Sequence, residues 1–251
     1  MNDKRIIGEK RNISYEAVQN FFEERGGTDK KHLYNYVMYL DDKPEVAVER
    51  DRQGKEKMDK LICVSPNMRV LDIGCGVGRY GTFFLERGAY YVGVDGSAKM
   101  IEKAEMNLNQ YNGKKLIVSN LLQISETLDQ AKENEPFDIV FDSGVFMYLN
   151  DDDCLDVMKK IACVGKKDSI FCLIESMAQE ERLTLNEFYS DDLKQSYSAI
   201  YRSENEYRSI MEFAFGRDYE IIYDEILDFE DGLQKKRQHV TMEHCFIWKH
   251  K

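Results

Sequence analysis

VLDIGCGVG, at residues 70–78, is the stretch that decides the fold. Its apolar start has the pattern of a buried strand, Asp72 stands near the end of that strand, and a Gly-x-Gly-x-Gly turn follows directly. Glycine is needed in such a turn because a side chain would keep a ligand away from the backbone. The pattern predicts a site for a nucleoside or nucleotide. The same glycine spacing also occurs in dinucleotide-binding domains and in ordinary tight turns.

A second acidic residue strengthens this interpretation. Residues 91–97 read YVGVDGS, so Asp95 ends the next apolar run, 23 residues after Asp72. A carboxylate at that place can accept hydrogen bonds from both ribose hydroxyl groups of a nucleoside. The glycine turn and Asp95 together predict a nucleoside site at the ends of two neighbouring strands. The alternative for Asp95 is a simple turn residue.

The segments around this site alternate between short apolar runs and helical patterns. We expect strands at residues 68–73, 90–94, 115–119, 137–142 and 169–175, and helices at 80–87, 98–110 and 152–162. Strands joined by crossover helices form a mostly parallel sheet with helices on both faces. The sequence therefore predicts an α/β fold, with a final pair of strands at 219–227 and 243–249 lying at one edge.

The length suits one domain, residues 1–251, around a single core. Residues 1–61 are predicted to form an N-terminal helical cover, with helices at 14–25 and 46–61. The ligand-binding core would span 62–177. An insertion at 178–217 is predicted to be mostly helical and to act as a lid, and 218–251 would hold the final strand pair.

The composition excludes several classes of function. The 46 acidic residues exceed the 35 basic ones, and the net charge of -11 makes nucleic acid a disfavoured partner. No stretch approaches the roughly 18 apolar residues of a membrane span, so no membrane partner is expected. The six cysteines form no Cys-x-x-Cys pair and have no histidine at zinc spacing, which predicts no metal site and a reducing, cytoplasmic location. A homodimer is compatible with this composition.

Three motifs together resemble the class I S-adenosylmethionine-dependent methyltransferases. They are VLDIGCGVGRYG at 70–81, GVDGSAKMIEKA at 93–104 and FDIVFDSGVFMYL at 137–149, and the resemblance covers roughly residues 55–175. It implies a Rossmann-like fold with a seven-stranded sheet whose last strand is antiparallel. It also implies S-adenosylmethionine as cofactor and S-adenosylhomocysteine as product.

The resemblance assigns roles to residues at the ends of the first four core strands. The glycine turn, with Gly74, Cys75, Gly76 and Gly78, would lie under the methionine part of the cofactor. Asp72 would face the methionine amino group, directly or through water. The remaining cofactor positions are the ribose site at Asp95 and Gly96, the adenine site at Asn120 and Leu121, and the mouth near the reactive methyl group at Asp142, Ser143 and Gly144.

Two of these assignments stay open at the level of sequence. The family often has an aspartate at the adenine site, and Asn120 departs from it, because its amide oxygen can accept a hydrogen bond but brings no charge. Asp142 could equally cap the next element.

Methyl transfer mainly requires alignment of the acceptor and exclusion of water, with a general base added in some enzymes. The candidate bases are His239, in the segment between the last two strands, and Glu175, after the fifth core strand. Their alternatives are an exposed loop histidine and a hydrogen-bonded structural carboxylate. Substrate-binding candidates are Tyr34, Tyr148, Tyr197 and Tyr201, with Tyr36 and Tyr39 nearby, although such tyrosines also pack as amphipathic surface.

The motif after the fourth strand narrows the range of possible methyl acceptors. Residues 142–145 read DSGV where amide-type methyltransferases have (N/D)PPY, and no Pro-Cys pair of the cytosine C5 class occurs. With the acidic charge, these absences favour transfer to an O or N atom of a small molecule. Residues 11–25 resemble bacterial enzymes that methylate capsule or other surface-polysaccharide precursors, including phosphoramidate groups. The alternatives are a protein or tRNA methyltransferase and a silent S-adenosylmethionine-binding protein.

Overall fold

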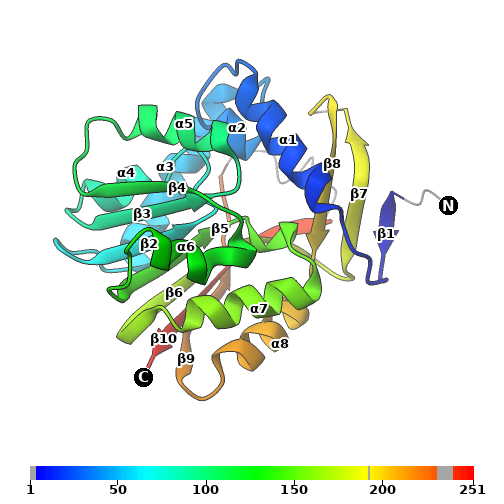
Figure 1. Cartoon of the computed structure of the whole chain (residues 1–251). Coiled ribbons are helices and arrows are strands. Elements are labelled where there is room, and N and C mark those ends of the chain that lie inside the picture. The colour runs from blue at the N-terminus through cyan, green and yellow to red at the C-terminus, as the bar shows by residue number, and fades with distance from the viewer. Residues whose placement is uncertain (1–3, 192, 231–239) are drawn as a thin grey trace.

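The computed structural model describes residues 4–191, 193–230 and 240–251 (Figure 1). The helices are α1 (Tyr15–Gly27), α2 (Asn35–Met38), α3 (Pro44–Leu61), α4 (Gly81–Leu85), α5 (Ala98–Asn107), α6 (Ile124–Gln130), α7 (Asp151–Ala162) and α8 (Glu204–Phe215), with short 3-10 helices η1 (Leu121–Gln123) and η2 (Phe146–Tyr148). The strands are β1 (Arg5–Ile7), β2 (Arg69–Ile73), β3 (Tyr90–Asp95), β4 (Lys114–Val118), β5 (Phe137–Ser143), β6 (Gly165–Ala178), β7 (Leu183–Ser190), β8 (Gln195–Tyr201), β9 (Tyr219–Ile226) and β10 (Thr241–His250).

Seven strands form the central sheet in the order β4-β3-β2-β5-β6-β10-β9 (Figure 1). β10 runs antiparallel to β6 and β9, whereas the pairings from β4 through β6 are parallel. The predicted α/β fold, with its mostly parallel sheet and antiparallel last strand, is confirmed. From β2 the chain continues to β3 on one side of the β2–β5 pair, and from β5 it continues to β6 on the other side. Ligands of open α/β sheets bind beside the carboxyl ends of the strands where the strand order reverses in this way.

Two hydrophobic layers cover the sheet, one on each face. Leu71 and Ile73 of β2 point to the face packed by α6, α7 and α8, while Val70 points to the face packed by α3, α4 and α5. Because side chains alternate along a strand, Asp72 shares the second face with Val70. The layers leave the carboxyl ends of the strands as the open edge of the sheet.

The N-terminal region contains the two predicted helices, together with α2 and the short strand β1. Ser14 caps α1 by accepting a hydrogen bond from the Ala17 N–H at 3.2 Å, and the helix runs through Gly26 and Gly27, two residues further than expected. α1 packs against α5 and against β8, which brings it across the open edge of the sheet (Figure 1). The predicted helix at 46–61 is also present, as α3.

The prediction of a mostly helical insertion at 178–217 is wrong. Leu183–Ser190 and Gln195–Tyr201 form the antiparallel strands β7 and β8, which belong with β1 to a separate three-stranded sheet. Among the described residues of this segment, only α8 is helical. The hydrophobic run Leu183–Leu185 and the run Ser198–Ile200 are buried along this hairpin. Long-range pairing with β1, which the sequence did not indicate, stabilises strands in a segment of mixed local propensity.

Two further elements differ from the expectations. η1 and α6 form the crossover between β4 and β5, where no helix was predicted, and Ile124 and Leu128 bury their side chains against the sheet.

Among the described residues, no helix is long and apolar enough to cross a bilayer.

Candidate active site

A cavity of about 980 Å³ lies at the carboxyl ends of the central strands. One side of it is formed by the turns after β2, β3, β4 and β5. The other side is formed by α1, by the segment from Val37 to Lys43 and by the β7–β8 hairpin. The cavity therefore lies between the sheet and the elements that flank its open edge, and its volume is within the size range of ligand pockets in proteins.

The glycine turn forms the floor at one end of the cavity. Gly74 has φ +65°, and a Cβ atom there would lie 2.1 Å from Cγ2 of Val145, so a larger residue cannot be accommodated without displacing η2 and the turn before it. Gly74 and Gly76 line the cavity, as the sequence predicted. Gly78 and Cys75 lie behind the lining, where Gly78 packs against Leu108, the residue directly after α5.

Asp95 lies at the end of β3 and lines the same end of the cavity. One carboxylate oxygen accepts from the Gly76 N–H at 2.8 Å and the other from the Ser97 N–H at 2.8 Å. Burial raises the pKa of Asp95 to about 6, while these backbone hydrogen bonds favour the charged form. Each oxygen keeps a second lone pair, so the carboxylate can still accept hydroxyl hydrogen bonds.

Helix α1 is hydrogen-bonded to the turn that follows Asp95. Gln19 donates through Nε2 to the carbonyl oxygen of Gly96 at 2.8 Å, and Glu23 accepts from the Ala98 N–H at 2.7 Å. Gly96 lines the cavity as predicted. The N-terminal cover is thus hydrogen-bonded directly to the predicted ribose end of the site.

Asn120 and Leu121 line the cavity after β4, at the predicted adenine position. The Asn120 side-chain oxygen accepts from the Leu122 N–H at 2.9 Å and caps η1. The side-chain oxygen that the sequence assigned to adenine therefore already accepts a backbone hydrogen bond. The amide NH₂ group of Asn120 is a further hydrogen-bond donor at this position. Leu121 is buried and offers an apolar surface.

Asp72 lies beneath the glycine turn and not in the cavity wall. It accepts a hydrogen bond from the Tyr91 hydroxyl group at 2.6 Å. Burial raises the pKa of Asp72 to about 7, and this hydrogen bond opposes the shift. The position follows from the strand alternation, which turns Asp72 toward α3 and α4, and a direct contact with a ligand in the cavity is not supported.

Asp142 and Glu175 form a buried carboxyl pair on the opposite face of the sheet. Asp142 lies behind the cavity lining, and among the described residues neither of its carboxyl oxygens has a hydrogen-bond partner. Burial, followed by the charge of Glu175, raises the pKa of Asp142 well above its usual value. Asp142 therefore lies behind the mouth of the site and does not line the cavity, and burial disfavours its charged form.

Glu175 lines the cavity, but its carboxylate is occupied. It accepts hydrogen bonds from the backbone N–H groups of Val145, Phe146 and Met147, at 2.7, 2.6 and 3.2 Å, and from the Tyr207 hydroxyl group at 3.2 Å. These bonds cap the N-terminus of η2. These hydrogen bonds match the structural alternative for Glu175. Burial raises the pKa of Glu175 to about 7, and its role as general base stays a prediction.

Ser143 and Gly144 line the cavity at the end of β5, as predicted, and Arg79 joins them. Arg79 donates through Nη2 to Ser143 Oγ at 3.1 Å, lies 3.4 Å from an oxygen of Asp51, and places its guanidinium carbon 4.2 Å from the centre of the Tyr80 ring. The sequence interpretation missed Arg79, although its place directly after the glycine turn was a signal. It supplies a half-buried positive charge at the mouth, paired with Asp51.

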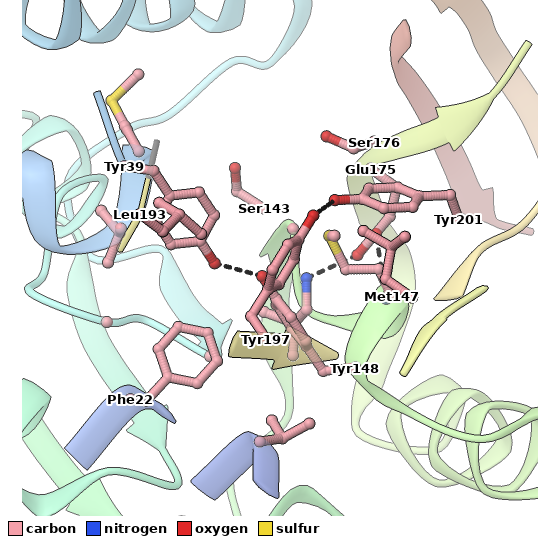
Figure 2. Close-up of a pocket in the computed structure, with 18 of the residues that line it drawn as sticks. Phe22, Tyr39, Ser143, Met147, Tyr148, Glu175, Ser176, Leu193, Tyr197 and Tyr201 are labelled. Carbon is pink, nitrogen blue, oxygen red and sulfur yellow. Dashed lines mark hydrogen bonds between the residues drawn. The ribbon is translucent and has the colours of Figure 1, made fainter. Parts of the chain in front are cut away.

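Tyrosine side chains from distant parts of the chain converge on the other half of the cavity (Figure 2). The hydroxyl groups of Tyr39 and Tyr148 are hydrogen-bonded to each other, and so are those of Tyr197 and Tyr201. Three of the four predicted substrate tyrosines thus line the cavity. The prediction for Tyr34 is not supported, because that side chain packs against His32 and contacts Lys55 outside the lining.

Tyr39 takes the place that the sequence assigned to Tyr34. Its backbone has φ 68° and ψ −85°, a strained conformation for a tyrosine, at the end of α2. The guanidinium group of Arg25 lies 4.9 Å from the centre of its ring. The strained turn directs the Tyr39 hydroxyl group to Tyr148 (Figure 2).

His239 lies outside the described residues. Among those that the structure does describe, no cluster of three histidine, cysteine, aspartate or glutamate side chains could hold a metal ion.

The residues present fit S-adenosylmethionine. A nucleoside would meet Asp95 and Leu121 at one end of the cavity, and the glycine turn would lie against the methionine part. A Cβ atom at Gly144, where φ is +79°, would point into open space, so backbone and not side chain borders the mouth there. Bound in this way, the cofactor would supply a methyl group on a positively charged sulfur.

Comparisons with known proteins agree with this geometry. Residues 64–226 match the family described as methyltransferase domain. Over 87 residues the chain is 42% identical to a 23S rRNA (uracil(1939)-C(5))-methyltransferase of Vibrio parahaemolyticus, covering 34% of this chain and 19% of that protein. Over 125 residues it is 25% identical to phosphoethanolamine N-methyltransferase 3 of Arabidopsis thaliana, covering 50% and 24%. The chain thus spans about a fifth to a quarter of the length of these curated relatives.

A solved structure extends the likeness to nearly the whole fold. Magnesium protoporphyrin IX methyltransferase from Synechocystis PCC 6803, with bound S-adenosylmethionine, superposes with a TM-score of 0.58 at 15% identity, over 93% of this chain and 95% of that one. At that identity the likeness concerns the fold. The family match, the strand order and the glycine turn lead to one conclusion: the chain belongs to the methyltransferase domain family, with the fold of the class I S-adenosylmethionine-dependent enzymes.

Proposed function

We propose that this protein transfers the methyl group of S-adenosylmethionine to an O or N atom of a small molecule bound in the tyrosine-lined half of the cavity. The observation that supports this most is the continuity of one cavity. Asp95 and the glycine turn lie at one end, and Tyr39, Tyr148 and Tyr197 lie at the other. A small acceptor bound there would meet the cofactor's methyl group at the mouth formed by Ser143.

The chain's own residues position and enclose the reactants in this proposal. Gln19 and Glu23 hold the N-terminal cover onto the turn after Asp95, and the β7–β8 hairpin covers the acceptor side. Enclosure excludes water and holds the acceptor in line with the carbon–sulfur bond, which accounts for most of the acceleration that a displacement of this type requires.

The enclosed acceptor half favours a small molecule over a polymer. The hairpin and α1 border this half of the cavity, and the net charge of -11 adds repulsion for RNA. The relative in Arabidopsis is named for a small acceptor, phosphoethanolamine. The rRNA relative matches about a third of this chain. A surface-polysaccharide precursor or a phosphoramidate group is a narrower hypothesis.

Calorimetry with S-adenosylmethionine, S-adenosylhomocysteine and NAD tests the cofactor directly. We expect micromolar binding of the first two ligands, loss of that binding in Asp95→Ala, and no loss in Asp156→Ala, a surface aspartate on α7. Binding of NAD alone would overturn the proposal.

A second assay separates an active enzyme from a silent cofactor-binding protein. Formation of S-adenosylhomocysteine is measured with phosphoethanolamine, sugar phosphates and phosphoramidates, and with tRNA and unfolded protein as polymeric acceptors. Turnover with a small acceptor supports the proposal. Turnover confined to a polymer, or cofactor binding with no turnover across the set, identifies one of the two alternatives.

A further inference from the structure

The direction of the hydrogen bonds at the mouth of the cavity indicates what kind of acceptor atom it can hold. Ser143 Oγ accepts a hydrogen bond from the Arg79 guanidinium group at 3.1 Å. The serine's own O–H proton is therefore directed away from Arg79, and the contact with a cation makes that proton a better donor. Because Ser143 lines the cavity, it is a hydrogen-bond donor beside the predicted position of the methyl group.

A second donor comes from the Tyr39–Tyr148 pair (Figure 2). Two hydroxyl groups joined by one hydrogen bond use one of their two protons, so one O–H group of the pair keeps a proton for another acceptor. Burial raises the pKa of Tyr39 to about 12 and that of Tyr148 well above its usual value. Both hydroxyl groups therefore stay protonated at neutral pH and act as donors instead of bases.

The carboxylates around the cavity are each held by another group. Glu175 accepts from three backbone N–H groups, and Asp95 from two. The other described carboxylates of the lining contact cations: Asp41 with Arg25 and Lys30, Asp42 with Lys31, and Glu243 with Arg50. A proton released by the acceptor would thus find no uncommitted carboxylate among the described lining residues.

We propose that the acceptor presents an oxygen that is already ionised at neutral pH, as in a carboxylate, phosphate or phosphonate. This inference rests on the proposed function and specifies its substrate class. A lone pair of that oxygen forms the new O–C bond as the C–S bond breaks, and the C–S electron pair stays on sulfur. One negative charge of the acceptor and the positive charge of the sulfonium group cancel as a methyl ester and a thioether form, so no proton has to leave.

The physical environment favours this charge combination. An enclosed site strengthens the attraction between an oxyanion and a sulfonium cation, and Ser143 and the Tyr39–Tyr148 pair replace part of the hydration that the anion loses. An ammonium acceptor would instead face the same donors and the Arg79 guanidinium group, and it would need a base before it could react.

Binding of simple probes to the protein saturated with S-adenosylhomocysteine tests the inference. Benzoate and methylphosphonate represent the oxyanion, and benzylamine is the cationic counterpart of benzoate. We expect the two anions to bind in the millimolar range and benzylamine not to bind. Ser143→Ala and the double variant Tyr39→Phe/Tyr148→Phe should each weaken benzoate binding about ten-fold, because each removes donors to a charged group. Tyr111→Phe, at a surface tyrosine bonded to Glu86, should bind benzoate like the wild type.

The possible results separate the two proposals. If S-adenosylhomocysteine itself fails to bind, the proposed function is wrong, and this inference with it. If it binds but neither anion does, or if benzylamine binds in preference to benzoate, the inference alone is overturned. Benzoate binding that is equal in the wild type and both cavity variants also overturns it, because the donors named here would then not contact the anion.

Discussion

Tyr39 and Tyr148 are hydrogen-bonded through their hydroxyl groups although they lie 109 residues apart in the chain. One belongs to the N-terminal cover and the other to η2, at the mouth of the cavity. The contact joins the cover to the catalytic edge of the sheet. The tyrosine-lined wall of the cavity therefore forms only when the N-terminal region is folded against η2.

Replacement of Arg25 tests how the cover is held. The Arg25 side chain is fully buried, donates to the carbonyl oxygens of Asn35 and Tyr36, and pairs with Asp41 at 2.6 Å. Arg25→Ala leaves these buried groups without their partner and should lower the free energy of unfolding by about 3–5 kcal/mol. Urea unfolding measures the change.

Arg52→Ala is the matched control for this experiment. Arg52 is about half exposed on α3 and pairs with Glu49 and Glu56, so its loss should leave the free energy of unfolding nearly unchanged. Equal effects of the two substitutions would show that the buried contacts of Arg25 do not hold the turn that carries Tyr39.

Gly74→Ala tests the close contact beneath the cavity. The positive φ alone costs alanine about 1–2 kcal/mol, and the new Cβ would collide with Val145. We expect a loss of cofactor affinity of ten-fold or more, measured by calorimetry, with partial recovery in Gly74→Ala/Val145→Ala. Gly27→Ala, where a Cβ atom would meet nothing within 4 Å, should bind like the wild type. Unchanged affinity in Gly74→Ala would mean that the turn does not contact the ligand.

The predicted residues that the structure places in the cavity wall include those whose chemistry is local. Gly74 and Asp95 were recognisable because a close backbone approach and a ribose-binding carboxylate each require one residue type at a fixed place after a strand. The four tyrosines converge through contacts among η2, β8 and the turn after α2. No pattern within the chain could show that Tyr39, and not Tyr34, faces Tyr148.

Strand alternation explains the two aspartates that lie behind the cavity. Asp72 shares a sheet face with Val70, and Asp142 shares one with Val140, so both point into packed layers beside the site. That alternation was available in the sequence, but the motif alone suggested that each aspartate would face the ligand. The β7–β8 hairpin was missed for a different reason, because its pairing with β1 spans most of the chain.

Asp142→Asn tests the buried carboxyl pair through the pH dependence of stability. The folded-state pKa of Asp142 lies well above its unfolded value, so its contribution to stability is fully present below the unfolded pKa and is lost as pH rises toward the folded one. The loss amounts to about 1.4 kcal/mol per pH unit in that interval. Asparagine does not ionise, so the variant should lose less stability than the wild type between pH 5 and pH 8.

Urea unfolding at several pH values in this range measures the difference in slope. Asp156→Asn, at an exposed aspartate paired with Lys160, serves as the control and should keep the wild-type slope. Parallel profiles for the wild type and Asp142→Asn would contradict the elevated pKa of Asp142.

The pH dependence of cofactor binding tests Asp95 in the same way. Its folded-state pKa is raised to about 6 by burial, so the carboxylate is mostly ionised at pH 7 and mostly protonated at pH 5. A protonated carboxyl group loses acceptor capacity for hydroxyl hydrogen bonds, and the affinity for S-adenosylhomocysteine should fall about ten-fold between pH 7 and pH 5. Asp95→Asn should bind weakly at both pH values, with a nearly flat profile. Circular dichroism at pH 5 verifies that the protein remains folded, and a flat wild-type profile would show that the ionised carboxylate does not contact the ligand.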